Sequence, residues 1–194
     1  MKNFLFVDSW FEREFKEKSD SRYPTFKAAI NLFLQSGGEN IVETGTTRML
    51  NDWGAGYSTY LFAVVAKTFG KHLWTVDIDP KNIEVCKQAT KDYVDCVTYE
   101  VADSHIFLSR FSLPIDLLYL DSVDFPLDGS NPLPCQEHQL KEFQLAEKNL
   151  NDKSVVLLDD NNFPSGGKTK LTKVYLMETG WRCVLDSQQS LFIR

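Results

Sequence analysis

Hydrophobic runs alternate with helical patterns along most of this chain. Five continuous apolar runs are predicted to be strands: residues 40–46, 72–78, 97–102, 115–120 and 154–158. Between them lie patterns with helical spacing, at residues 56–69, 80–93, 104–111 and 136–149. Strands that alternate with helices, and that are apolar on both faces, are typical of a parallel sheet covered by helices on both sides. The pattern therefore predicts a doubly wound α/β fold.

The two ends of the chain depart from this alternation. Residues 1–22 mix aromatic and charged side chains and predict a short helix or arm packed on the body, and a further helix is expected from Pro24 to the Gly37–Gly38 pair. We interpret residues 1–38 as a helical arm on a single domain formed by residues 39–194.

The last part of the chain predicts a hairpin. After a final helix at about residues 168–179, two strand-like runs, residues 181–186 and 190–193, are separated by a short polar turn. Two such runs are expected to pair as antiparallel strands. A doubly wound sheet that ends in a hairpin differs from the plain dinucleotide-binding pattern.

Composition narrows the class of protein. The chain has 194 residues, of which 43% are hydrophobic and 25% charged, which is ordinary for one soluble domain. The net charge of -6, without a run of Lys or Arg, argues against binding to nucleic acid. An acidic balance suits a cationic ligand, although solubility explains it more simply. No apolar run reaches the length of a membrane span and no convincing signal peptide is visible, so a cytoplasmic location is expected.

The four cysteines show no metal-binding spacing. They are Cys86, Cys96, Cys135 and Cys183, and three of them lie in or beside apolar runs. Buried free thiols in a reducing compartment are expected, although an even number of cysteines leaves disulfides open.

The most informative segment is residues 41–59, IVETGTTRMLNDWGAGYST. A short buried strand ends at Glu43, the chain breaks at Gly45, and Gly54 and Gly56 precede a helical pattern. A strand, a glycine-bearing turn and a helix form the first half of a nucleotide-type βαβ unit. Glycine is expected there because a Cβ atom would keep a ligand away from the backbone.

Acidic residues follow each of the five predicted parallel strands. They are Glu43, Asp77, Asp103, Asp121 and the run Asp159-Asp160-Asn161-Asn162. Any one of them is explained by a helix cap or a solvated turn. Together they would meet at the carboxyl edge of the sheet, where ligands of such folds bind, and would repel one another without a cationic ligand or a metal.

With these motifs in this order, the chain resembles class I S-adenosylmethionine-dependent methyltransferases. The segments VETGT, VDIDP, VADS, IDLLYLD and VVLLDDN carry the resemblance, which covers about residues 38–194. It implies a Rossmann-like, mostly parallel sheet of seven strands in the order 3-2-1-4-5-7-6, with helices on both faces and S-adenosyl-L-methionine as cofactor.

The resemblance also implies roles for individual residues. Glu43 would lie near the cofactor's ammonium group, Asp77 would accept hydrogen bonds from the ribose hydroxyls, and Asp103 would bind the adenine amino group. The full set of implied cofactor-binding residues is Glu43, Gly45, Gly54, Gly56, Ser58, Asp77, Asp103, Ser104 and Asp121. One departure is the long segment between Gly45 and Gly54, which folds over the ligand, lines the acceptor site or is a surface excursion.

A metal site is a further implication of the resemblance. Asp121, Asp160 and Asn161 match the pattern with which catechol-type O-methyltransferases hold Mg²⁺. Asp124, however, stands where those enzymes place a lysine, and the loop at residues 125–134 is unlike theirs. Metal dependence therefore stays open.

Three residues are candidates for catalysis. Asp121 ends the fourth strand, and Asp124 is a base, a further metal ligand or a turn cap. His138 is either a general base near Asp121 or a helix residue that faces solvent or packs against Trp or Phe. The Gly166-Gly167-Lys168 segment either binds an anion or, more simply, gives a flexible entry to the last helix.

The hypothesis is a methyltransferase that uses S-adenosylmethionine to methylate an oxygen of a small molecule. A non-catalytic binding protein with the same fold is one alternative. A nicotinamide-dependent oxidoreductase is another, but the first turn has no compact GxGxxG and acids crowd where a pyrophosphate would lie. The identity of the acceptor and the oligomeric state do not follow from the sequence.

Overall fold

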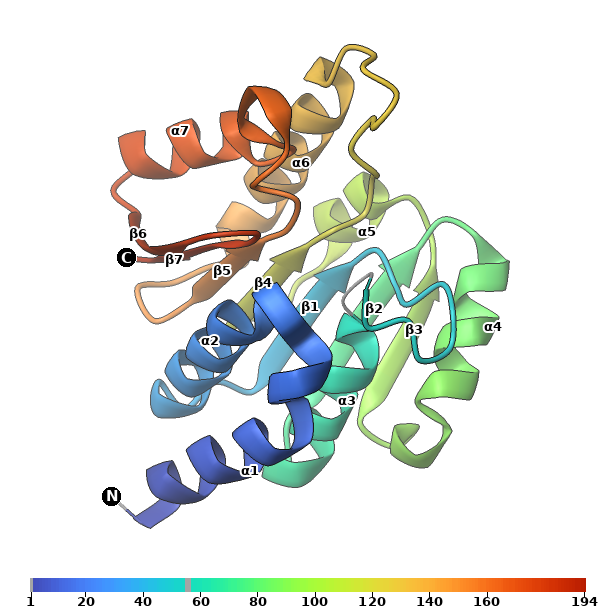
Figure 1. Cartoon of the computed structure of the whole chain (residues 1–194), viewed down its shortest axis with the longest axis vertical. Helices are drawn as coiled ribbons and strands as arrows, with labels where there is room; N and C mark the ends of the chain where they lie inside the picture. Colours follow the sequence, from blue (N-terminus) through green and yellow to red (C-terminus); the bar gives the residue numbers. More distant parts are fainter. Residues whose placement is uncertain (1, 55–56) are drawn as a thin grey trace.

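A seven-stranded sheet forms the centre of the molecule (Figure 1). The computed structural model describes residues 2–54 and 57–194, with side chains described from Ser9 onward. The strand order is β3-β2-β1-β4-β5-β7-β6, which confirms the predicted order. The strands are β1 (Asn40–Thr44), β2 (His72–Asp77), β3 (Val97–Val101), β4 (Leu117–Leu120), β5 (Val155–Leu158), β6 (Arg182–Asp186) and β7 (Ser190–Ile193). Only β7 runs antiparallel to its neighbours, β5 and β6.

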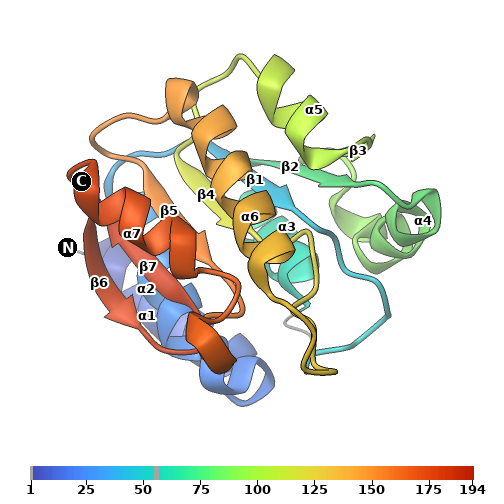
Figure 2. The same cartoon turned by 90° about the horizontal axis from the view of Figure 1, so that it is seen from above.

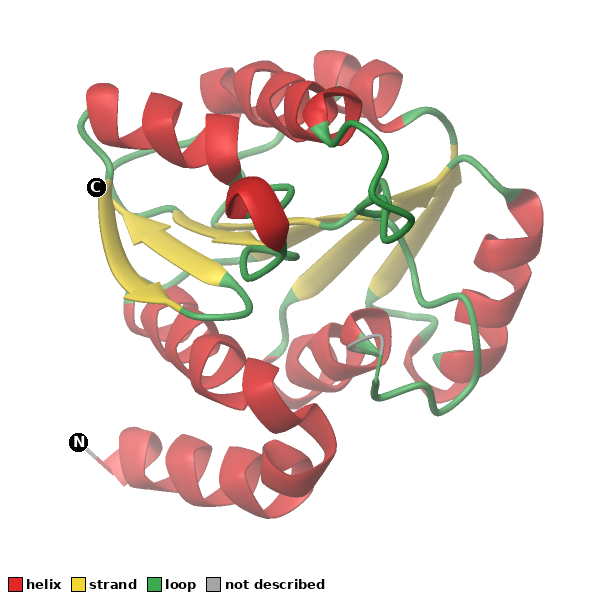
Figure 3. Ribbon diagram, turned by 45° about the horizontal axis from the view of Figure 1, so that its top comes forward, coloured by secondary structure: helices red, strands yellow, loops and turns green. Residues whose placement is uncertain are grey.

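Helices cover both faces of this sheet, as predicted (Figures 2 and 3). One face carries α2 (Tyr23–Gln35), α3 (Ser58–Phe69) and α4 (Pro80–Ala89), with α1 (Lys2–Ser19) packed outside α2. The other carries α5 (Ser104–Arg110), α6 (Leu133–Ala146) and α7 (Lys170–Glu178). Four short 3-10 turns complete the described elements: η1 (Asp20–Arg22), η2 (Lys91–Tyr93), η3 (Glu147–Asn149) and η4 (Pro164–Gly166).

The central strands are buried on both sides, which explains their continuous apolar runs. Every residue of β4 and of β5 is buried. On one side, Tyr119 of β4 packs against Phe26 of α2 and Phe62 of α3, and on the other, Phe143 of α6 packs against Trp181. Burial of aromatic side chains in both layers is a major contribution to the stability of such a sandwich.

The ends of several helices differ from the expectation. The arm predicted at residues 1–22 contains a helix that continues to Ser19, and its Phe11 and Phe15, four residues apart, are buried in the same core cluster as Phe26. Helix α6 begins at Leu133 rather than at Gln136, because Pro134 suits a first helical turn.

Two further expectations concern the thiols and the membrane. All four cysteines have free thiols, and Cys86, Cys96 and Cys135 are buried, as predicted. No described helix combines the length and the apolar composition that a membrane crossing requires.

Glu43 joins three elements beneath the carboxyl edge of the sheet. It lies in β1 and has no exposed surface. The hydroxyl of Ser58, at the start of α3, donates to Oε1 at 2.6 Å, and the hydroxyl of Thr75 in β2 donates to Oε2 at 2.7 Å. Burial raises the pKa of Glu43 to about 7, because the two hydroxyl donors only partly replace the lost water.

This raised pKa predicts a pH-dependent stability. The folded chain binds the Glu43 proton more tightly than the unfolded chain, so the free energy of unfolding should fall as pH rises from 4.5 toward about 7, by at most about 1.4 kcal/mol per pH unit. We expect Glu43→Gln to flatten this fall, measured by urea unfolding across that range. Glu39→Gln, at an exposed acid paired with Lys71, is the control and should keep the wild-type slope. Equal slopes for Glu43→Gln and wild type would contradict the prediction.

Candidate functional site

Two adjoining cavities open at the carboxyl ends of the strands. The first has a volume of about 450 Å³ and lies between the segment after β1, the start of α3, the end of β2 and Asp121. The second has a volume of about 110 Å³ and lies beside Asp103, Ser104 and His138. Gly45 and Asp77 line both cavities, so they form one continuous cleft.

Asp77 lies at the centre of this cleft. Its carboxylate accepts hydrogen bonds from the backbone N–H of Thr46 at 3.2 Å, the backbone N–H of Asp79 at 2.8 Å and the side-chain amide of Asn82 at 3.1 Å. These bonds fix the orientation of the carboxylate at the mouth of the cleft. Asp79 has a different principal role, since it caps α4 by accepting from Lys81 N at 2.8 Å.

The predicted glycines have separate outcomes. Gly45 has a φ of 81°, and a Cβ atom there would lie 2.3 Å from the backbone oxygen of Asp121, so this position requires glycine where β1 and β4 end side by side. Gly54 lines neither cavity, and its carbonyl instead accepts from Arg22 Nη1 at 2.9 Å. Gly56 lies outside the described residues.

Ser58 and Glu43, which are joined by a hydrogen bond at the start of α3, lie at different depths. Ser58 lines the first cavity, whereas Glu43 lines neither. The predicted position of Glu43 near a ligand's ammonium group stays a prediction, and in the described structure its carboxyl group is wholly covered. Glu43 instead fixes the start of α3 through its hydrogen bond with Ser58.

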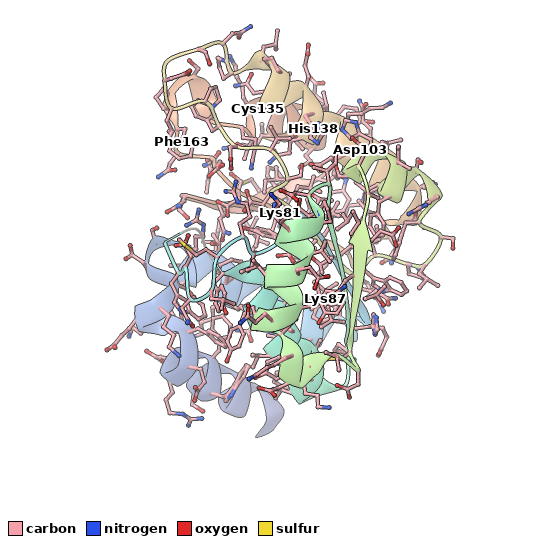
Figure 4. The ribbon with its side chains drawn as sticks, turned by 90° about the vertical axis from the view of Figure 1, so that its right-hand side faces the viewer. Lys81, Lys87, Asp103, Cys135, His138 and Phe163 are labelled. Atoms are coloured by element: carbon pink, nitrogen blue, oxygen red, sulfur yellow. The ribbon has the colours of Figure 1, made fainter. Side chains whose placement is uncertain are left out.

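The second cavity brings together three predicted residues. Asp103 caps α5 by accepting from Ile106 N, and Ser104 Oγ lies 3.2 Å from His138 Nε2. Figure 4 labels Asp103 and His138 of this cavity. The buried Glu142 carboxylate lies 3.6 Å from His138 Nε2, and although burial raises the pKa of Glu142, the histidine reverses this and leaves it below its usual value. His138 thus faces the Asp103 end of the cleft and lines only this cavity, whereas Asp121 lines only the first.

The long segment after Gly45 crosses the cleft rather than leaving it. Arg48 lines the first cavity and makes a bidentate ion pair with Asp124, with N–O distances of 2.7 and 2.9 Å. This pair joins the segment to the loop after β4, and the Arg48 guanidinium lowers the pKa of Asp124. Asp121 lines the first cavity, whereas Asp124 lines neither, so these two candidate catalytic acids do not face the same cavity. Trp53 anchors the far end of the segment against Phe15.

Two cations from outside the predicted motifs neutralise the acids after β4 and β5. Arg22, in η1, binds the buried Asp159 carboxylate at 2.9 Å. Burial would raise the pKa of Asp159, but Arg22 and then Lys168 reverse this and lower it. The Tyr119 hydroxyl also donates to Asp159. The self-repulsion expected of the acids is thus relieved within the chain.

Lys168 is the second of these cations. Its Nζ lies 2.7 Å from Asp121 Oδ1 and 3.3 Å from Asp160 Oδ2, and the residue is only 1% exposed. Burial raises the pKa of Asp121 to about 8, with Lys168 opposing the rise and Asp159 and Asp160 adding to it. Two cations face three carboxyl groups, so Asp121 is the acid of this cluster that most readily holds a proton.

The predicted Mg²⁺ ligands do not form a metal site. Asp121 and Asp160 share the Lys168 ammonium, and the Asn161 side chain is turned away, with Nδ2 donating to Asp186 at 3.0 Å and Oδ1 accepting from Thr169 at 2.7 Å. No group of three or more His, Cys, Asp or Glu side chains in the described part of the chain is arranged to hold a metal ion.

Two functional residues, Arg22 and Lys168, were missed by the sequence interpretation. Lys168 has a signal in the sequence, because the Gly166-Gly167-Lys168 segment predicts either an anion site or a flexible helix entry, but neither expectation points to the acids. Arg22 had none, because nothing in its local pattern links it to acids more than a hundred residues away.

The cleft suits a cofactor that carries hydroxyl groups and positive charge. Of the described residues that line the first cavity, four are acids and one is a cation: Asp52, Asp77, Asp79, Asp121 and Arg48. A pyrophosphate would be repelled there, whereas ribose hydroxyls and a sulfonium would be attracted.

Comparisons with known proteins agree with this chemistry. Residues 52–161 match a family described as "Methyltransferase domain". No curated protein sequence matches the chain significantly.

Solved structures share the fold at low sequence identity. The S-adenosylhomocysteine-bound methyltransferase PaMTH1 of Podospora anserina aligns with a TM-score of 0.62 at 16% identity, over 97% of this chain and 86% of that one. The calicheamicin methyltransferase CalS11 aligns with a TM-score of 0.61 at 12% identity, over 90% and 80%. An rRNA methylase of Streptococcus thermophilus aligns with a TM-score of 0.57 at 8% identity, over 87% and 95%.

The family match covers more than half of the chain, and the fold and the cleft fit it. The chain therefore belongs to the methyltransferase-domain family and is a class I S-adenosylmethionine-dependent methyltransferase.

Proposed function

We propose that this enzyme methylates an oxygen atom of a small molecule, with Asp121 as the general base. The observation that carries the proposal is the position of Asp121, which lines the first cavity at the end of β4 and whose partly exposed carboxyl group is tied to Lys168. Burial raises the pKa of Asp121 to about 8, and a base is most effective when its pKa lies near the working pH.

The residues around the cleft would hold the two ends of S-adenosylmethionine. Asp77, already oriented by three donors, is suited to the ribose hydroxyls, and Asp103 and Ser104 to the adenine ring in the second cavity. Gly45 leaves the backbone of both cavities bare. When bound, the cofactor supplies an electrophilic methyl group.

Asp121 would act on the acceptor's side of the cleft. An acceptor hydroxyl that donates to the Asp121 carboxylate would lose its proton to that carboxylate oxygen as its own oxygen takes up the methyl group. The methyl–sulfur bond would break in the same step, with S-adenosylhomocysteine as the leaving group. Because the methyl donor is already activated, orientation of the acceptor would supply much of the rate, up to about 7–11 kcal/mol in well-oriented systems.

The charge of the cleft favours a small acceptor over RNA. Acids outnumber cations among the residues that line the first cavity, and the Asp124 carboxylate lies 72% exposed beside it on the Arg48 side. A phosphate backbone would be repelled by this surface, because RNA binding needs an excess of positive charge. Structural likeness to an rRNA methylase at 8% identity concerns the fold alone.

The cofactor assignment predicts the effect of a change at Asp77. We expect Asp77→Ala to weaken binding of S-adenosylmethionine and S-adenosylhomocysteine by about 1.5–3 kcal/mol, because hydrogen bonds to a charged acceptor are lost. Isothermal titration calorimetry measures this, with NAD as a competing class of ligand. Asp95→Asn, at an exposed ion pair with Lys67, is the control and should bind normally. Absence of heat with both adenosyl compounds in the wild type would refute the cofactor assignment.

The base assignment predicts a pH profile. Since Asp121 must lose its proton to act as a base, kcat/KM should rise with pH and level off above about 8. We expect Asp121→Asn to lower kcat by about 10²–10⁴-fold and to remove this rise. Asp124→Asn should retain the rise, because Arg48 lowers the pKa of Asp124 and holds it outside the cavity. Loss of the rise in Asp124→Asn alone would assign the base to Asp124 instead.

A second experiment tests which class of molecule accepts the methyl group. Radioactive methyl transfer from S-adenosylmethionine to a panel of small phenols and alcohols is compared with transfer to total rRNA. The proposal expects label only in small molecules, and label only in RNA would overturn it.

A further inference from the structure

The segment before α7 has a conformation that brings one lysine into the protein interior. Gly167 has a φ of 63°, and a Cβ atom there would lie 2.1 Å from the backbone oxygen of Asp160, so only glycine is accommodated. Lys168 N donates to Asp160 O at 2.9 Å, and the side-chain amide of Gln136 donates to Gly167 O at 2.8 Å. The turn is thus fixed from β5 on one side and from α6 on the other.

This turn places the Lys168 ammonium between two strand ends. Its distances to Asp121 Oδ1 and Asp160 Oδ2 are 2.7 and 3.3 Å, and its side chain is 2% exposed. Burial lowers the pKa of Lys168, but attraction by Asp121 and Asp160 outweighs this, and the pKa is raised overall. The group is therefore a permanent cation, covered from solvent, that bridges a carboxylate after β4 and a carboxylate after β5.

A divalent cation bound to the same carboxylates would need that position. The family resemblance implied such an ion at Asp121, Asp160 and Asn161 and left metal dependence open, but the side-chain amide of Asn161 contacts Thr169, Lys173 and Asp186 instead. Two carboxylates can hold a hydrated divalent cation when waters complete its octahedral shell, so the Lys168 ammonium between them is what takes the place of the ion.

We propose that the Lys168 ammonium stands in for a divalent cation between Asp121 and Asp160, so that the acceptor site is built and oriented without a metal. Lys168 is a positioning residue, since its covered ammonium reaches Asp121 and not the cavity. The inference rests on the proposed function in one respect, namely that the methyl acceptor binds at Asp121.

The consequence is a class of acceptor. A metal site favours an acceptor with two adjacent oxygens that chelate the ion, whereas this site offers a single carboxylate, whose side chain is 23% exposed. It selects an acceptor that presents one hydrogen-bond donor, such as a lone hydroxyl group, and gives no advantage to a chelating pair.

The experiment asks whether removal of the lysine creates a metal site. Wild type, Lys168→Ala and Lys168→Ala/Asp121→Asn are titrated with MnCl₂, and bound Mn²⁺ is followed by the loss of the free-ion paramagnetic resonance signal and by Tm. We expect the wild type to bind no Mn²⁺ and to keep its Tm. In Lys168→Ala, saturating Mn²⁺ should bind and raise the Tm by about 5 °C, because the ion replaces the missing cation. The double variant should not respond.

A matched control is Lys173→Ala, which removes another lysine close to the same segment, paired with Asp186 at 2.6 Å. It should behave like the wild type. Folded Lys168→Ala that binds no Mn²⁺ would overturn the proposal. If Lys168→Ala does not fold, measurements on the wild type still test the proposal. Binding of Mn²⁺ to the wild type but not to Asp121→Asn would overturn the proposal. Methyl transfer that is unchanged after EDTA treatment would support it.

These readouts need neither cofactor nor acceptor, apart from the EDTA assay. Failure of the proposed O-methylation would leave the metal titrations interpretable, and failure of the titrations would leave the Asp121 pH profile intact. For specificity, a monophenol and the matching catechol should be methylated with similar kcat/KM. A strong preference for the catechol that EDTA abolishes would contradict the metal-free site.

Discussion

Neutralisation of buried carboxyl groups is the constraint on which this structure depends. A parallel sheet collects the ends of its strands at one edge, and here those of β4 and β5 bring together the fully buried Asp159 and the partly buried Asp121 and Asp160. Unpaired charges in such a place cost several kcal/mol each. Arg22 and Lys168 remove most of that cost, and they arrive from opposite ends of the sequence.

This constraint makes the N-terminal helices part of the functional architecture. Arg22 lies in the turn between α1 and α2, and one guanidinium binds both Asp159 after β5 and the Gly54 carbonyl before α3. Phe15 of α1 packs on Trp53, at the end of the segment that crosses the cleft. The predicted arm therefore supports the loops around the cofactor cleft, in addition to covering one face of the sheet.

Much of the fold could be predicted from local pattern. The apolar runs located all seven strands, and the family resemblance gave their order, while the acids at the ends of the strands marked the cleft. Partners separated widely in sequence could not be predicted. Nothing near Asp121 indicates that its neighbour is Lys168, and a glycine pair does not by itself reveal that Gly167 packs against the Asp160 carbonyl. The depth of Glu43 could not be predicted either, since a strand end can lie beneath a cleft as easily as in it.

The buried ion cluster also constrains how this protein can change during evolution. Asp121 and Asp160 share Lys168, and Arg22 binds Asp159, so loss of either cation alone leaves a carboxyl group without a partner. Substitutions at Lys168 should therefore be accepted mainly in combination with changes at Asp121 or Asp160. Gly167 belongs to the same group, because the lysine cannot reach the acids without its turn. If these positions change together among relatives, those relatives neutralise the charges of this site in a different way.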